Sequence, residues 1–232
     1  MRSDKRRDRR NIRRRDFESF RDSMAERWFG HLAEADERHV YFGSAYAFYV
    51  VKGGRMGGHD SRLLEVFYGN RPVDQTVETV SSGTGLPDIR TRFVVESGAA
   101  LEYHRTERGT VFCLLTPARS EGFSPSESAV VLAHYRSPDS LHSPFEIDAH
   151  WRALMSYFEC TALDGDPRWF DRFRVGWLRF TRPLIIGGKT QIPDYQAALF
   201  KIGEWSFTVG LSGAILFGIQ WLIGAPPTRG AG

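Results

Sequence analysis

The strongest constraint on the fold of this chain is an apolar stretch in its C-terminal part. Between Ser206 and Gly224, 19 consecutive residues carry no charge. As a helix with a rise of about 1.5 Å per residue, the stretch would be roughly 28 Å long, close to the bilayer hydrocarbon core of about 30 Å. The alternative is a buried core helix, but the stretch has no polar face and lies at the extreme C-terminus. We predict a transmembrane helix over residues 205–224.

The residues around this segment predict its orientation. Trp205 and Trp221 lie near its two ends, where aromatic rings favour the membrane interface. Nearby basic residues are more frequent before the segment than after it, with Arg182, Lys189 and Lys201 against Arg229. Because basic residues stay on the cytoplasmic side, we expect a single-pass, tail-anchored protein in a bacterial inner membrane. Its N-terminal domain would be cytoplasmic.

Small residues recur every four positions within the predicted span. A helix face of this kind lets the backbone of a partner helix approach closely, and Gln220 could add an interhelical hydrogen bond. The alternative is that such residues are simply common in membrane helices. A homo-oligomer, or a complex with another membrane protein, is the partner expected from this face, which consists of Ser206, Gly210, Ala214 and Gly218.

The formal net charge of +3 hides a strong asymmetry along the chain. Residues 1–15 hold nine basic and two acidic side chains, which gives +7 and leaves −4 for residues 16–232. A basic arm can bind anionic lipid or nucleic acid, and the third alternative is a solvated, disordered tail. The anion-binding candidates are Lys5, Arg6, Arg7, Arg9, Arg10, Arg13, Arg14 and Arg15.

Hydrophobic periodicity divides the rest of the chain into an amphipathic helix and a β-rich domain. Apolar residues at intervals of three and four predict a helix over residues 16–37. Residues 38–192 predict an α+β domain with about six mainly antiparallel strands and flanking helices. A helix over 193–204 and a tail over 225–232 complete the prediction. The expected strands are 44–52, 62–68, 91–96, 100–106, 110–116 and 129–135, with a hairpin at 107–109.

Two helices are predicted within the β-rich domain, near 144–161 and 167–181. The first follows Ser143, and Glu146 lies three residues later, which is the spacing of a capping box. The second interleaves aromatic residues with arginines. We interpret its aromatic rings as core, and the alternative is a helix lying in the membrane interface.

No specific catalytic motif is present. The sequence lacks a phosphate-binding loop, a nucleophile elbow, a zinc-binding helix and a dinucleotide fingerprint. His59, Asp60, His104 and His134 are the weak candidates for acid–base chemistry. No metal or cofactor is expected, and Cys113 and Cys160 are too few for a disulfide scaffold.

These patterns together predict a noncatalytic, membrane-anchored interaction or scaffold protein that presents its β-rich domain at the membrane. One alternative is a membrane-disrupting effector of a bacterial defence or toxin system, whose cytosolic domain senses nucleic acid or another ligand. The other alternative is a hydrolase that uses His59 and Asp60.

Overall fold

The computed structural model describes residues 2–55, 58–81 and 87–193, without the side chains of residues 2–4 and 78–90. The predicted membrane helix 205–224 and tail 225–232 therefore lie outside the described residues, as does the predicted helix 193–204 apart from Pro193. The two interface tryptophans, the small-residue face and Gln220 fall in the same part of the chain. In the described ranges, no helix combines the length and the apolar character that crossing a bilayer requires.

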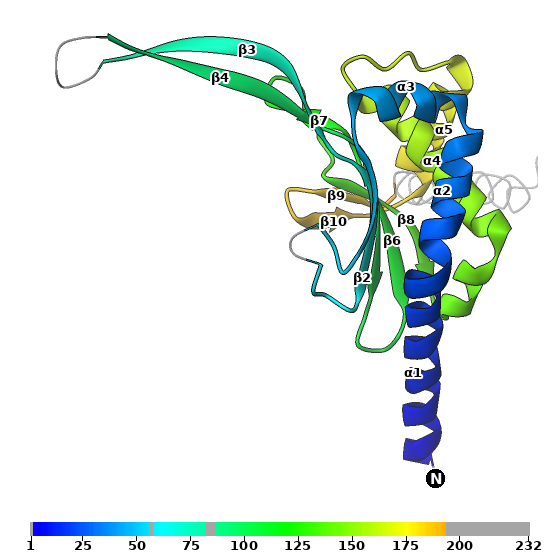
Figure 1. Cartoon of the computed structure of the whole chain (residues 1–232). Helices are drawn as coiled ribbons and strands as arrows, with labels where there is room; N and C mark the ends of the chain where they lie inside the picture. The colour runs from blue at the N-terminus through cyan, green and yellow to red at the C-terminus, as the bar shows by residue number, and fades with distance from the viewer. Residues whose placement is uncertain (1, 56–57, 82–86, 194–232) are drawn as a thin grey trace, which may run out of the picture.

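The fold is α+β, with a mainly antiparallel sheet and flanking helices, as the sequence predicted. Among the described residues the main sheet has seven strands, and it contains five of the six predicted ones (Figure 1). The strand predicted over 91–96 belongs to a second sheet. The spatial order of the seven strands is β1 (Phe48–Lys52), β2 (Leu63–Tyr68), β5 (Ala100–Arg105), β6 (Val111–Thr116), β8 (Ala129–Tyr135), β9 (Leu184–Ile186) and β10 (Lys189–Gln191).

A long β-hairpin extends from this sheet and projects away from the body (Figure 1). It consists of β3 (Asn70–Ser81) and β4 (Pro87–Ser97), which pairs with the short β7 (Arg119–Ser120). Strands β2 and β5 pair with each other, and β3 and β4 continue them after a bend at Gly69 and Gly98. A Cβ atom at Gly98 would lie 2.4 Å from the Cβ of Tyr68, so this bend requires glycine.

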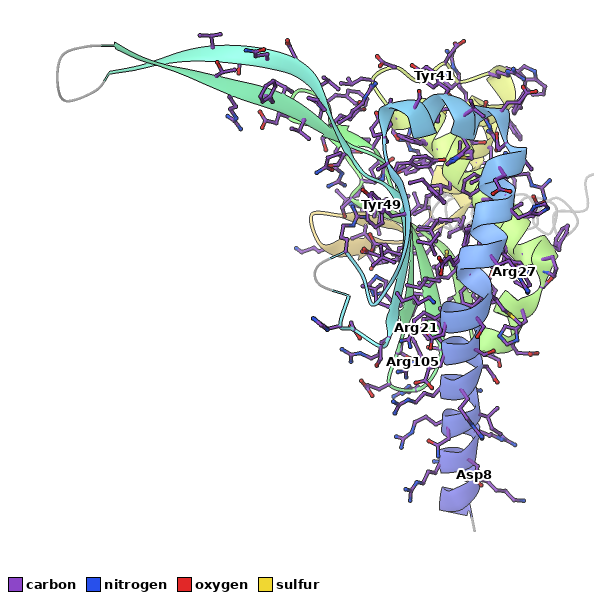
Figure 2. The ribbon with its side chains drawn as sticks, viewed as in Figure 1. Asp8, Arg21, Arg27, Tyr41, Tyr49 and Arg105 are labelled. Carbon is purple, nitrogen blue, oxygen red and sulfur yellow. The ribbon has the colours of Figure 1, made fainter. Side chains whose placement is uncertain are left out.

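The helices cover one face of the sheet. The first 34 described residues form α1 (Arg2–Ser19), a π-helical turn (Phe20–Met24) and α2 (Ala25–Ala35) without a break. The basic arm is therefore a helix and not a disordered tail, and the part of it around Asp8 extends beyond the body (Figure 2). The remaining helices are α3 (Glu37–Ala45), a 3₁₀ helix (Pro138–His142), α4 (Pro144–Thr161) and α5 (Trp169–Thr181).

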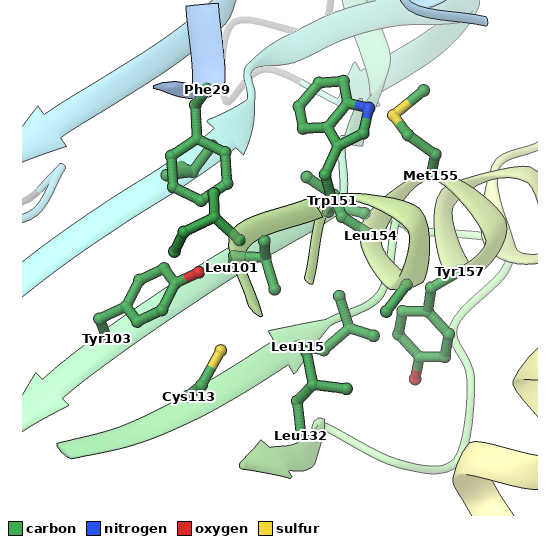
Figure 3. Packing of buried hydrophobic residues seen from close by; sticks show 14 of the residues in the cluster. Phe29, Leu101, Tyr103, Cys113, Leu115, Leu132, Trp151, Leu154, Met155 and Tyr157 are labelled. Carbon is green, nitrogen blue, oxygen red and sulfur yellow. The ribbon is translucent and has the colours of Figure 1, made fainter. Parts of the chain in front are cut away.

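The core lies between the sheet and helices α2, α3 and α4, and it is rich in aromatic rings. Phe42 stacks on Phe158 with ring centroids 4.0 Å apart, and Tyr68 packs on Phe158 at 4.7 Å. Figure 3 shows Phe29, Leu101, Tyr103, Leu115 and Leu154 in the same cluster. Aromatic pairs of this kind add to the hydrophobic stabilisation that burial alone provides.

Several predicted elements need correction. The first predicted strand begins at Phe48 because residues 44–45 belong to α3, and the basic arm joins helix 16–37 into one element that ends at Ala35. The bounds of α4 match the prediction. Ser143 is its N-cap residue, but the predicted capping box is wrong, since its side chain makes no capping bond and Glu146 accepts a hydrogen bond from Tyr135. Both cysteines are free thiols.

Candidate functional site

The projecting hairpin is fixed to the body by a buried ion pair at its base. Glu96 of β4 is fully buried and lies opposite Arg71 of β3 in the strand register. The guanidinium of Arg71 donates to the Oε2 atom of Glu96 from Nε at 3.1 Å and from Nη2 at 2.8 Å. A two-point ion pair of this type holds both strands in one geometry.

Other parts of the body complete this buried ion pair. The Tyr46 hydroxyl donates to Oε2 of Glu96 at 2.7 Å, and the Leu163 amide donates to Oε1 at 2.8 Å. Burial, followed by the hydrogen bond to Glu96, raises the pKa of Tyr46, so the phenol keeps its proton. Arg71 also pairs with Asp164 at 2.6 Å and lies over the Tyr46 ring. Because the α3–β1 connection and the α4–α5 loop both bind this carboxylate, the hairpin cannot swing freely at its base.

Beyond this base the hairpin exposes apolar side chains on one face. Phe93 is 58% exposed and Val77 is 63% exposed, and Val95 is exposed as well. The register pairs Phe93 with Gln75 and Val77 with Thr91, which places Phe93, Val77 and Val95 on the same face. A two-stranded ribbon is at best marginally stable on its own, and unpaired strand edges readily accept a partner. The ribbon therefore has the features of a binding element.

The structure brings two of the four predicted catalytic candidates into one row across the sheet. The register aligns His104 of β5, Phe112 of β6 and His134 of β8. His134 stacks on Phe112 with centroids 4.3 Å apart, and His104 lies 3.0 Å from a carboxylate oxygen of Glu102. The Phe112 ring separates the two histidines, so they do not share a substrate position.

His59 and Asp60 lie in the exposed β1–β2 loop. Asp60 accepts hydrogen bonds from the backbone and side chain of Arg62, which lower its pKa and keep it ionised. Within residues 2–55, 58–81 and 87–193, no group of three His, Cys, Asp or Glu side chains has a geometry that could hold a metal ion. Asp148 pairs with Arg152 on the surface, while His150, two positions later on the same helix, is buried.

His150 belongs to a buried polar network that the sequence did not reveal. The Tyr135 hydroxyl donates to Glu146 at 2.7 Å and therefore accepts from Nε2 of His150 at 2.9 Å. Nδ1 of His150 then accepts from the Tyr103 hydroxyl at 2.9 Å, with the Cys113 thiol 3.9 Å away. The imidazole is thus assigned as the neutral Nε2–H tautomer.

The surroundings of this network favour a structural role. Burial, together with the positive charge of Arg182, lowers the pKa of His150 to about 4. Burial also raises the pKa of the Cys113 thiol, which keeps it protonated and inert. Tyr103 and Cys113 are fully buried, so a substrate cannot reach them without local opening.

A cleft of about 860 Å³ lies among α2, α3, α4 and α5 and carries charges of both signs. Arg38 crosses it, pairing with Asp36 at 2.8 Å and with Asp171 of α5 at 3.5 Å. Asp171 is buried and accepts a hydrogen bond from Ser156 of α4 at 2.7 Å. These contacts fasten α5 to α3 and α4.

The surface of α5 overturns the interpretation of its aromatic residues as core. Only Asp171, Val175 and Leu178 of this helix are buried, and the aromatic side chains face outward. This surface and the hairpin are therefore the two features of the described chain that suggest contact with other molecules. Compared with known proteins, the chain matches no family model, no curated sequence and no solved structure.

Proposed function

We propose that this protein is a noncatalytic interaction protein, anchored in a bacterial inner membrane by residues 205–224, whose projecting hairpin binds a protein partner on the cytoplasmic side. The observation that carries the proposal is the buried ion pair of Arg71 and Glu96. A hairpin that was only a surface loop would not need a fully buried carboxylate with four hydrogen bonds at its base.

The exposed side chains of the hairpin support a protein partner. Phe93, Val77 and Val95 form an apolar stripe on one face, and aromatic residues such as phenylalanine are enriched at protein interfaces. The strand edges add unpaired backbone groups, which a partner strand can satisfy. An interface that combines both is typical of β-strand addition.

The anchor is supported by the length and composition of the uncharged segment that begins at Ser206. The small residues Gly210, Ala214 and Gly218 within it favour association of two copies or with another membrane protein. Two membrane-associated copies would present two hairpins, which would strengthen binding to a partner with two matching sites.

A site-specific crosslinking experiment tests the hairpin. A photoreactive benzoylphenylalanine replaces Phe93 in the full-length protein in its native membrane, and Phe145, exposed on α4, serves as the control position. We expect one defined crosslinked protein from position 93 and not from position 145. The double variant Val77→Asp, Phe93→Asp should lose this partner, while Phe145→Asp retains it. Equal crosslinking at both positions would contradict the proposal.

The anchor is tested separately by membrane extraction. Full-length protein should stay in the pellet after carbonate washing, and a chain of residues 1–200 should not. A full-length protein that carbonate releases would remove the anchor from the proposed function but would leave the hairpin experiment valid.

A further inference from the structure

The outward face of α5 carries an exposed aromatic stripe. Trp169 is 78% exposed, Phe173 is 66% exposed and Trp177 is 56% exposed. At 3.6 residues per turn, these residues and Phe180 lie within about 80° of one another around the helix. The Phe173 and Trp177 rings stack with centroids 6.4 Å apart. Large aromatic side chains gathered on one exposed face mark a binding surface.

The opposite face of α5 fixes this orientation through polar contacts. Asp171 is held by Ser156 of α4 and by Arg38 of α3. Arg179 donates from Nε to Glu127 at 2.7 Å, and Tyr157 of α4 donates to the same carboxylate oxygen at 2.9 Å. Rotating the helix to bury its aromatic rings would expose Asp171 and break both sets of contacts. These polar contacts therefore keep the aromatic face of α5 directed outward.

The exposed charged side chains between the N-cap and the C-cap residues of α5 are all positive. Arg168, Arg172 and Arg182 are exposed at the start, on the side and at the end of the helix. The one acidic residue of α5, Asp171, is buried on the far side. Tryptophan and phenylalanine flanked by arginine are the composition of a helix that lies in the interface of an anionic membrane.

The chain leaves the described body beside the end of α5. In the β9–β10 pair, Gln191 lies opposite Leu184, which follows the last residue of α5 by three positions. Only residues 194–205 separate Pro193 from the uncharged segment. Since an extended chain spans at most about 3.5 Å per residue, this connection keeps the body within roughly 45 Å of that segment.

We infer that the aromatic face of α5 lies on the anionic headgroup region of the cytoplasmic leaflet and fixes the orientation of the body on the membrane. The inference rests on the proposed anchor, which brings α5 close to the bilayer. The base of the hairpin is tied to the α4–α5 loop, and the hairpin extends from there to the opposite side of the view from α5 (Figure 1). In this orientation we expect it to reach out from the membrane-bound face. The partner would then meet the hairpin in the cytoplasm.

The test uses full-length protein labelled with 5-fluorotryptophan in nanodiscs that hold one copy each. Variants that replace each tryptophan by phenylalanine assign the ¹⁹F signals. One set of discs contains phosphatidylcholine with phosphatidylglycerol, and the other contains phosphatidylcholine alone. Both contain a lipid with a nitroxide near its carbonyl groups. Trp151 of α4 is buried and Trp28 of α2 is half-buried, so these two provide internal controls.

We expect the signals of Trp169 and Trp177 to lose most of their intensity in the anionic discs, while Trp28 and Trp151 keep theirs. The loss should be weaker in discs of phosphatidylcholine alone. Unchanged signals of Trp169 and Trp177 overturn the inference. Shielding of these residues from both the lipid nitroxide and a soluble gadolinium chelate also overturns it, since protein would then cover the face. Equal losses in both types of disc overturn the preference for anionic lipid.

Trp205 and Trp221 report on the anchor independently. Broadening of these two signals alone supports the anchor and overturns the inference about α5. Broadening of Trp169 and Trp177 alone supports lipid binding by α5 and removes the anchor from the proposed function.

Discussion

Helices α4 and α5 follow one another in the chain and are both rich in aromatic residues, but they place these residues in opposite environments. In α4, Trp151, Tyr157 and Phe158 are buried against the sheet and the neighbouring helices. In α5, Trp169 and Trp177 face outward, and the buried side contains Asp171. The side of α4 that faces the core is selected by apolar packing, whereas that of α5 is selected by polar partners on other elements. Residue type alone does not decide which face of a helix is buried.

The largest loss of stability should occur when a tryptophan of α4 is truncated. Trp151 packs on Phe29 and Phe48, and its Nε1–H donates to Asp36 at 3.0 Å. Trp151→Ala should lower the free energy of unfolding by about 3–5 kcal/mol, because it leaves a cavity and removes one of the hydrogen bonds to Asp36, whose Oδ2 atom still accepts from Arg38. Urea unfolding of the full-length protein in mild detergent, followed by near-ultraviolet circular dichroism, measures this effect.

Phe145→Ala in the exposed first turn of α4 is the matched control and should change stability little. Equal losses in the two variants would show that burial does not distinguish these positions.

The second prediction concerns the buried imidazole of α4. Its pKa falls from the ordinary 6.5 to about 4 in the folded protein, so the unfolded chain binds its proton first. The contribution of His150 to stability is therefore complete above pH 6.5 and is lost progressively as the pH falls toward 4. The loss should amount to about 3 kcal/mol.

The test measures the free energy of unfolding of wild type and of His150→Gln at each pH between 7 and 4.5. The difference between the two proteins isolates the contribution of His150 from that of the carboxylates. The wild type should have the steeper pH dependence, and His134→Gln, on the sheet surface, should behave as wild type. Parallel curves for wild type and His150→Gln would rule out a neutral buried imidazole.

The sequence predicted the position of α4, near 144–161, because three local signals coincide, namely Ser143, Pro144 and an apolar run with helical spacing. It did not predict β3, because Gly69, Asn70 and Pro72 resemble a turn. Proline is tolerated there since β3 is an edge strand and the register shifts between Pro72 and Asp74. Local sequence cannot show that a hairpin continues beyond its sheet.

The candidate sites were harder to predict than the fold, because they depend on contacts between residues that are far apart in the sequence. Arg71 and Glu96 are 25 positions apart, and Glu127 and Arg179 are 52 positions apart. Hydrophobic periodicity does not show which distant residues pair with each other. Without these pairs, the aromatic residues of α5 were assigned to the core. The buried face of α5 carries only Val175 and Leu178 beside Asp171, and nothing in the local sequence marks it as the inner face.

The third prediction tests whether polar contacts hold α5 in place. Asp171→Ala removes the acceptor for Ser156 and leaves part of the Arg38 charge unpaired, so it should cost about 2–3 kcal/mol. Hydrogen exchange of the α5 amides should become faster than that of α4. Asp166→Ala, which removes an exposed carboxylate before the same helix, is the control. Unchanged exchange in α5 after Asp171→Ala would mean that apolar contacts alone hold it.

The smallest effect on stability is expected at the aromatic face of α5. Trp177→Ala removes a side chain that is 56% exposed and whose ring contacts are with Phe173 and Phe180 of the same helix. Its free energy of unfolding should stay within about 0.5 kcal/mol of wild type. When Trp177→Ala and Trp151→Ala are measured under the same conditions, their free energies of unfolding compare two tryptophans on consecutive helices. A loss of several kcal/mol at Trp177 would mean that this ring is covered in the folded protein, and the outward face of α5 would then be a packing surface instead of a binding surface.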